Sequence, residues 1–166
     1  MSSINENAIE QFAIRLFERL GYEYNSAKVV IAYAEAINKN SVLLINELYA
    51  SLKRINPDLS DEVLTAAVDQ LKNSNLADNL IENNKLFHQL LTEGISIDSY
   101  ANGETIGELV KVIDFANPAN NDFLVANQIT YKYKNHTKRP DVVLFINGIP
   151  LVVLELKTLL KSKLPY

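Results

Sequence analysis

The chain has 166 residues, of which 48% are hydrophobic and none is cysteine, a composition typical of one globular domain. The absence of cysteine excludes disulfides, thiolate metal sites and thiol nucleophiles. Because no apolar run approaches the ~20 residues of a membrane span and the N-terminus is polar, we expect an intracellular protein without membrane association.

The net charge of −4 is unevenly distributed along the chain. Residues 132–166 contain seven lysines and arginines against two acids, whereas the 131 residues before them carry a net charge of −9. A basic C-terminal fifth favours contact with a polyanion at one edge of the domain, and a solvated basic tail is the alternative.

Hydrophobic periodicity predicts a mainly helical first part, residues 1–93. A first helix is expected within Ile4–Leu20 and ends before Gly21; its apolar face comprises Ile9, Phe12, Ala13, Leu16, Phe17 and Leu20. Further helices are predicted at Ala27–Asn38, Val42–Lys53, Leu59–Lys72 and Leu76–Leu91. Ser41 and Ser60 have the residue type that caps helix N-termini, and they precede two of these segments.

After Gly94 the pattern changes to that of strands, which makes residues 94–166 the β-rich part of the same domain. Strands are predicted at Ile95–Tyr100, Glu108–Phe115, Phe123–Tyr133, Asp141–Ile146 and Leu151–Lys157. The last two strands are strongly apolar and are separated by Asn147-Gly148, a dipeptide typical of hairpin turns.

Three charged residues stand at the ends of these two apolar strands. Asp141 begins the first strand, and Glu155-x-Lys157 ends the second, so that Glu155 and Lys157 share one face. A two-residue turn would place Asp141 on the opposite face, whereas a three-residue loop with a bulge would bring both carboxylates together. We therefore predict the three-residue loop.

Two carboxylates beside one lysine suit the hydrolysis of a phosphodiester. The carboxylate oxygens would hold a hard cation such as Mg²⁺, and the lysine would position the attacking water or stabilise charge that develops on phosphorus. The alternative is a turn-forming aspartate together with an ordinary Glu/Lys pair at the surface.

Longer stretches of the chain carry a resemblance to a known family. These stretches are AIEQFAIRLFERLGYEY at Ala8–Tyr24, RINPDLS at Arg54–Ser60, NNKLFHQLLTEGI at Asn83–Ile95, VIDFANPANNDFLVANQIT at Val112–Thr130 and the segment from Arg139 to Lys157. Together they resemble the PD-(D/E)xK nuclease superfamily, and specifically the N-terminal endonuclease region of the R subunit of type I restriction enzymes.

The resemblance implies an α/β fold, in which a restriction-endonuclease-like mixed sheet is flanked by helices and the N-terminal half is helical. It implies that Asp141, Glu155 and Lys157 are catalytic and that both acids bind Mg²⁺. Glu10 is similar to an additional metal-binding acid of the superfamily; the alternative is a glutamate on the polar face of its helix.

In the parent enzyme, the resemblance implies cleavage of double-stranded DNA coupled to ATP-driven translocation. Methyltransferase and specificity subunits would be partners of this enzyme in the cytoplasm of a prokaryote, where it would defend against phage. A DNA-contacting strip is predicted just before Asp141, with an exposed loop of solubilising charges as the alternative. Its residues are Lys132, Lys134, Lys138 and Arg139.

The chain departs from the family pattern after Lys157. A helix with a Q-x-x-x-Y motif and ATP-dependent motor lobes follow the ExK strand in type I R subunits, whereas nine residues follow Lys157 here and no G-x-x-x-x-G-K-[ST] segment occurs. We therefore expect a chain truncated at its C-terminus relative to the family. The alternatives are a catalytically silent DNA- or partner-binding module and a nuclease of another PD-(D/E)xK branch.

Overall fold

The computed structural model describes residues 6–26, 42–73, 79–101, 103–133 and 136–157. The helices are α1 (Glu6–Arg19), α3 (Ile45–Ile55), α4 (Asp61–Lys72), α5 (Leu80–Glu93) and the short 3₁₀ helix η1 (Pro118–Asn120). The strands are β1 (Glu23–Ser26), β2 (Ile95–Ala101), β3 (Glu104–Val110), β4 (Phe123–Asn127), β5 (Tyr131–Tyr133), β6 (His136–Lys138), β7 (Val142–Ile146) and β8 (Ile149–Leu154). None of these helices is long and apolar enough to cross a membrane. The helix predicted at Ala27–Asn38 lies outside the described residues.

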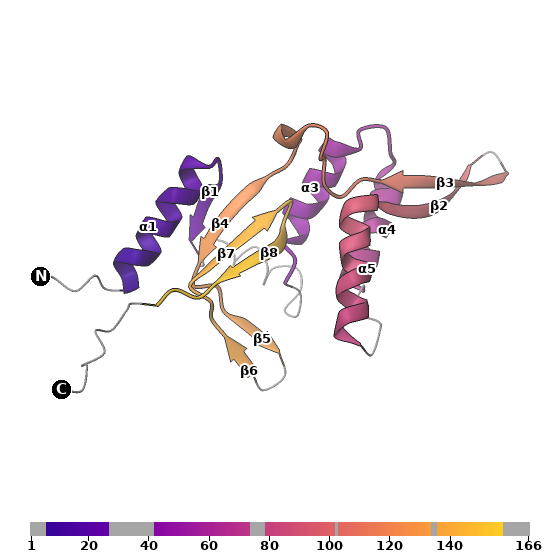
Figure 1. Ribbon diagram of the computed structural model, residues 1–166. Helices are drawn as coiled ribbons and strands as arrows, with labels where there is room; N and C mark the ends of the chain where they lie inside the picture. The colour runs from indigo at the N-terminus through magenta and orange to yellow at the C-terminus, as the bar shows by residue number, and fades with distance from the viewer. Residues whose placement is uncertain (1–5, 27–41, 74–78, 102, 134–135, 158–166) are drawn as a thin grey trace, which may run out of the picture.

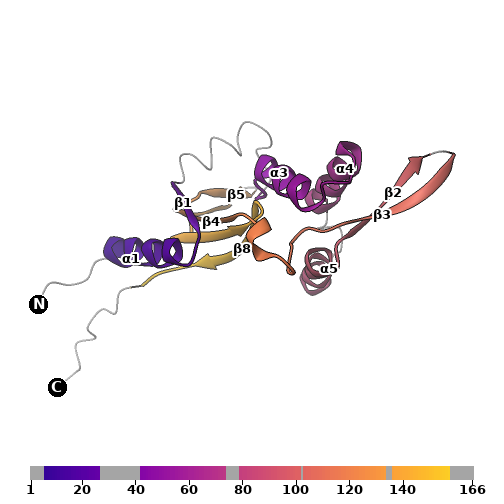
Figure 2. The same ribbon diagram turned by 90° about the horizontal axis from the view of Figure 1, so that it is seen from above.

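A mixed four-stranded sheet organises the candidate site. Its strand order is β1-β4-β7-β8, with β1 parallel to β4 and the other neighbours antiparallel. Figures 1 and 2 show α1 on one side of this sheet and α3 on the other. Ile14 of α1 packs with Val125 and Val142 on the first side, and Leu44, just before α3, packs with Val143 and Phe145 on the second. The predicted α/β class with a mixed sheet flanked by helices is thus confirmed.

Several strands differ from their predictions. The short strand β1 was not predicted, because Glu23–Ser26 shows no clear alternation and gains its pairing from β4. The single strand predicted at Phe123–Tyr133 is wrong, because Gln128 adopts φ 55° and breaks it into β4 and β5. Strand β5 pairs with β6 in a separate hairpin, which projects below the sheet in Figure 1.

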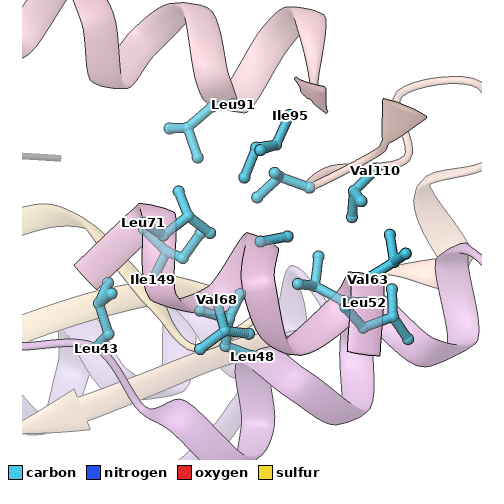
Figure 3. Close-up of a cluster of buried hydrophobic side chains, with 13 residues drawn as sticks. Leu43, Leu48, Leu52, Val63, Val68, Leu71, Leu91, Ile95, Val110 and Ile149 are labelled. Atoms are coloured by element: carbon cyan, nitrogen blue, oxygen red, sulfur yellow. The ribbon is translucent and has the colours of Figure 1, made fainter. Parts of the chain in front are cut away.

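A second group of elements surrounds the base of the β2–β3 hairpin. In Figure 2 the hairpin leaves the body between α4 and α5. Figure 3 shows the apolar cluster at this base, where Leu71 of α4, Leu91 of α5 and Ile95 of β2 lie close to Ile149 of β8. This cluster joins the helices of the first half to the hairpin that carries the candidate site.

The helix caps were predicted in part. Ser60 accepts a hydrogen bond from the backbone N–H of Val63 and caps α4 as expected. The predicted cap Ser41 lies outside the described residues. The helix predicted to begin at Val42 begins at Ile45, as α3. Strand β3 spans Glu104–Val110 rather than the predicted Glu108–Phe115, because it pairs with β2 from the turn at Gly103 to the pair Ile95–Val110, where β2 begins.

The orientation of α1 corrects the predicted apolar face. Phe12, Leu16 and Leu20 are exposed to 64%, 46% and 67%, whereas Glu10 and Ile14 are buried. Glu10 therefore does not lie on a solvated face of the helix. Its burial beneath α1 is possible because the sheet offers hydrogen-bond donors to its carboxylate.

Candidate functional site

The turn between β7 and β8 has two residues, so the predicted three-residue loop is wrong. Asn147 and Gly148 have φ values of 51° and 76°, and Ile146 pairs with Ile149. These positive angles are those of the turn that Asn-Gly favours in hairpins. Gly148 also packs closely against the start of α3, where a Cβ would lie 2.5 Å from the carbonyl oxygen of Leu44.

A bulge in β8 nevertheless produces the predicted change of parity between the two strands. Phe145 pairs with Pro150, but Leu144 pairs with Val152, so that Leu151 has no opposite residue. One extra residue in a strand reverses the face on which every following side chain lies. The predicted parity is therefore right, although its origin lies within the strand and not in the turn.

The last paired residues of the hairpin are Val142 and Leu154, so Asp141 and Glu155 lie one residue beyond the ends of β7 and β8. If the register beyond the bulge is continued by one step, Asp141 and Glu155 fall opposite one another. The backbone N–H of Leu156 donates a hydrogen bond of 2.6 Å to Oδ2 of Asp141. Asp141 is half-buried and Glu155 is exposed.

Alternation also separates two faces at this end of β8. Leu154 and Leu156 pack with the apolar cluster beneath α1. The predicted strand Leu151–Lys157 is wrong at both ends, because β8 begins at Ile149 and ends at Leu154. The alternation of burial nevertheless continues past β8: Glu155 and Lys157 are exposed where Leu154 and Leu156 are partly buried, which puts the two charged residues on the opposite face. Within the described residues, no group of three or more His, Asp or Glu side chains is arranged to hold a metal ion. The catalytic and metal-binding roles of Asp141, Glu155 and Lys157 stay predictions.

Glu10 lies on the α1 side of the sheet and is only 5% exposed. Its carboxylate accepts hydrogen bonds from the side-chain amides of Asn127 (2.6 Å) and Gln128 (3.1 Å). The sequence analysis missed these two amides. Asn127 is the last residue of the apolar strand β4 and Gln128 follows it directly, and a pair of polar residues at the end of an apolar strand was the available signal.

Arg139 is the basic residue that the structure connects to this end of the sheet. Its guanidinium donates to Oε1 of Gln128, whose backbone N–H donates to the carbonyl oxygen of Asp141. Of the other predicted DNA-contacting residues, Lys132 lies opposite Thr137 in the β5–β6 hairpin. Lys138 is exposed on β6, and Lys134 lies outside the described residues.

The β5–β6 hairpin is anchored to the sheet by Tyr131. The ring of Tyr131 packs against the cluster that contains Val143 and Phe145 of β7. Burial raises the pKa of the Tyr131 phenol to about 12, because ionisation would place a charge away from water. This packing fixes the base of the hairpin beside the start of β7.

Comparison with known proteins adds independent information. The family model described as "Type I restriction enzyme R protein N terminus" matches residues 3–163. The chain is 32% identical over 163 residues to the type I restriction enzyme HindI endonuclease subunit of Haemophilus influenzae, covering 96% of this chain and 15% of that protein. It is 35% identical over 162 residues to the putative MjaIXP endonuclease subunit of Methanocaldococcus jannaschii, covering 95% of this chain and 16% of that protein.

Proposed function

Since the chain belongs to the family of N-terminal regions of type I restriction enzyme R proteins, we propose that it is an endonuclease domain that cleaves double-stranded DNA with Mg²⁺. The family alone does not identify the reacting residues. We assign the reaction to Asp141, Glu155 and Lys157, at the end of the β7–β8 hairpin.

The register of this hairpin is the observation that carries the assignment. The bulge at Leu151 sets a register that, continued one step past the pair Val142–Leu154, supports placing Asp141 opposite Glu155, whereas an unbulged pairing would turn the two side chains to opposite faces. Lys157 follows Glu155 by two residues and shares its face. A surface Glu/Lys pair of purely structural origin would have no need for this change of parity.

The donor set suits Mg²⁺. This ion prefers oxygen ligands and is usually held by one or two carboxylates, with water and substrate phosphate completing its coordination. Asp141 uses one oxygen to accept the N–H of Leu156 and retains further lone pairs, and Glu155 is open to solvent. Bound there, Mg²⁺ would polarise a phosphoryl oxygen and acidify a water molecule.

The residues of the chain itself have separate roles in this proposal. Asp141 and Glu155 hold the ion, and the ammonium of Lys157 orients the attacking water or stabilises negative charge on phosphorus. Lys132, Lys134, Lys138 and Arg139, which precede β7 in the chain, would contact the phosphate backbone and bind DNA without reading its sequence.

The chain spans about one-sixth of the length of the curated relatives that it matches. We propose that the remainder of such a subunit supplies ATP-driven translocation, and that methyltransferase and specificity subunits select the DNA. These activities would bring DNA to the nuclease domain, so the domain itself needs no site for sequence recognition.

A plasmid-nicking assay tests the assignment. The parent chain is incubated with supercoiled plasmid in Mg²⁺ or in EDTA, beside Asp141→Asn and Lys157→Ala. We expect cleavage in Mg²⁺ alone and a loss of about a hundredfold or more in each variant, which is the usual cost of removing charge stabilisation at a reacting centre. Asp98→Asn and Lys85→Ala, which make the same changes on β2 and α5, serve as matched controls.

The possible results have distinct meanings. Equal cleavage by the parent, Asp141→Asn and Lys157→Ala would refute the assigned site. Cleavage that is lost equally in Lys85→Ala would point to an effect of net charge on DNA binding. Absence of cleavage by the parent, with DNA binding retained, would favour a catalytically silent scaffold.

A further inference from the structure

Glu10 is a buried carboxylate whose hydrogen bonds are made to the end of strand β4. Its side chain lies beneath α1, with 5% of the residue exposed. Oε1 accepts from Asn127 at 2.6 Å, and Oε2 accepts from Gln128 at 3.1 Å. Burial of an ionised carboxylate is tolerated only when such donors replace its water, and these two amides supply them.

The chemistry of Glu10 fixes the direction of both amides. A carboxylate can only accept hydrogen bonds, so each amide must present its NH₂ group to Glu10 and its carbonyl oxygen away from it. Oδ1 of Asn127 accepts from the hydroxyl of Tyr24, and Oε1 of Gln128 accepts from the guanidinium of Arg139. Since arginine can only donate, the hydrogen bonds from Gln128 to Glu10 and from Arg139 to Gln128 are compatible with a single orientation of the Gln128 amide.

The side-chain hydrogen bonds that run from Arg139 through Gln128 to Glu10 form a relay, and the backbone of Gln128 connects this relay to the candidate site. Its N–H donates at 3.0 Å to the carbonyl oxygen of Asp141, and its φ of 55° turns the chain out of strand β4. Gln128 therefore holds the side chain of Arg139 and the backbone of Asp141 at the same time. The two residues are separated only by Pro140, which is buried and restricts the backbone between them.

The charge of Arg139 is left available by this arrangement. Its partner in the relay is a neutral amide, and within the described residues no carboxylate forms an ion pair with it. The guanidinium has five N–H donors, of which the bond to Gln128 occupies one. Arg139 is exposed, so a phosphate can approach its guanidinium from solvent.

We propose that Arg139 binds a backbone phosphate of DNA and that Glu10 is a positioning residue that orients it through Gln128, rather than a ligand of the metal. The inference rests on the proposed nuclease function and deepens it. Both oxygens of Glu10 are engaged by amides on the α1 side of the sheet, whereas Glu155 and Lys157 belong to the other face. The neutral amide of Gln128 transmits orientation while it keeps the negative charge of Glu10 away from the bound phosphate.

Equilibrium binding of a fluorescein-labelled DNA duplex in EDTA tests the proposal without any cleavage step. Affinity is measured by fluorescence anisotropy over a series of salt concentrations. We expect Arg139→Gln to weaken binding about tenfold and to make the salt dependence shallower by about 0.9 in the log–log slope, as loss of one phosphate contact predicts. Lys85→Gln, the same charge change on α5, is the matched control and should alter affinity less than about twofold.

Two variants break the relay without removing Arg139. Glu10→Gln places an NH₂ group against one of the two amides, which disturbs their orientation, and Gln128→Asn shortens the bridge while keeping a residue type that tolerates positive φ. Each should weaken binding about threefold in the parent background and have no effect in the Arg139→Gln background. Such non-additivity is the signature of residues that act through Arg139, and a purely structural role would not produce it.

The outcomes that would overturn the proposal are specific. If Glu10→Gln and Gln128→Asn leave affinity unchanged, the relay does not position Arg139. If they weaken binding equally with and without Arg139, they act by another route. If Glu10→Gln instead raises only the Mg²⁺ concentration needed for plasmid nicking, Glu10 is a metal ligand. Circular dichroism establishes that each variant is folded, and failure of nicking with these binding results intact would refute the nuclease assignment alone.

Discussion

The backbone N–H of Leu156 donates to Oδ2 of Asp141 at 2.6 Å and holds the two strands of the hairpin together beyond their last residue pair. The side chain of Asp141 thus takes the place of a backbone acceptor at the end of the ladder. The residue that we assign to the metal therefore also stabilises the hairpin. Its two roles can be separated, because a hydrogen bond needs only an acceptor whereas Mg²⁺ binding needs the charge.

Asp141→Asn and Asp141→Ala should differ in stability but not in activity. Asparagine retains a carbonyl oxygen for the N–H of Leu156, whereas alanine leaves this donor without its partner. We expect Asp141→Ala to lower the free energy of unfolding by about 1–3 kcal/mol and Asp141→Asn to cost less than half of that. Urea unfolding measures the difference, and equal losses in the two variants would contradict the bond. Both variants should abolish Mg²⁺-dependent nicking.

Gly148→Ala should be far more damaging than Gly21→Ala. Both glycines have positive φ, 76° and 95°, so both substitutions introduce backbone strain of about 1–2 kcal/mol. A Cβ at Gly148 would also lie 2.5 Å from the oxygen of Leu44 and 2.8 Å from the nitrogen of Leu48, whereas nothing lies within 4 Å at Gly21. We therefore expect Gly148→Ala to shift α3 and to lower the thermal midpoint much more than Gly21→Ala does. Similar midpoints in both variants would show that α3 does not pack on the turn.

The pH dependence of stability should contain a contribution from Asp114. The backbone N–H of Asn117, the side-chain amide of Asn120 and the N–H of Ala116 hold the pKa of this carboxyl below its usual value. The unfolded chain therefore binds a proton more readily than the folded one. The stabilisation is present above about pH 4 and is lost as the pH falls through the folded pKa.

Asp114→Asn removes this titration while it keeps an acceptor for the backbone N–H groups. Its urea midpoint should fall less steeply than that of the parent between pH 5 and pH 2.5. Asp98→Asn controls for the loss of one negative charge elsewhere on the surface. A parallel fall in the parent and in Asp114→Asn would mean that the turn does not favour the ionised carboxyl.

Tyr131→Phe should be neutral or stabilising. Within the described part of the chain, the hydroxyl of Tyr131 is buried without a hydrogen-bond partner, and its ring packs on β7. Removing the hydroxyl relieves the cost of an unsatisfied polar atom and should raise the free energy of unfolding by up to about 1 kcal/mol. A loss of more than about 1 kcal/mol would indicate a partner for this hydroxyl.

Tyr131 should also affect the stability of the protein at alkaline pH. Burial raises the pKa of Tyr131 to about 12, above the value near 10 expected in the unfolded chain. The stability due to this difference is present below about pH 10 and is lost as the pH rises toward the folded pKa. The parent should therefore lose stability above pH 10 more steeply than Tyr131→Phe does, which urea midpoints at alkaline pH would measure.

The helices of the first half could be predicted because their signals are local. Ser60 accepts a hydrogen bond from the N–H of Val63, only three residues further along the chain. The apolar positions of α4 also lie within one segment: Val63, Leu64, Ala67, Val68 and Leu71. Strand β1 could not be predicted in this way. Its four residues become a strand through parallel pairing with β4, which follows much later in the chain.

The residue types of the candidate site were visible in the sequence, but their environment was not. Asp141, Glu155 and Lys157 stand out because charge interrupts two apolar runs. The burial of Glu10 has no such signal, because the most hydrophobic stripe of its helix, with Phe12 and Leu16, faces outward. What turns Glu10 inward is the pair of amides at the end of β4, and local periodicity contains no information about so distant a partner.

The bulged residue Leu151 separates two constraints that an ordinary hairpin would couple. The length of the turn is dictated by the packing of Gly148 against α3, while the face reached by Glu155 is set by one residue further along β8. Deletion of the bulged residue would leave the turn packed against α3 but would move the side chain of Glu155 to the other face of the hairpin. Insertion of a residue in the turn would make the tip of the hairpin collide with α3. Changes of length in this short hairpin are thus restricted twice, by packing at its tip and by chemistry at its open end.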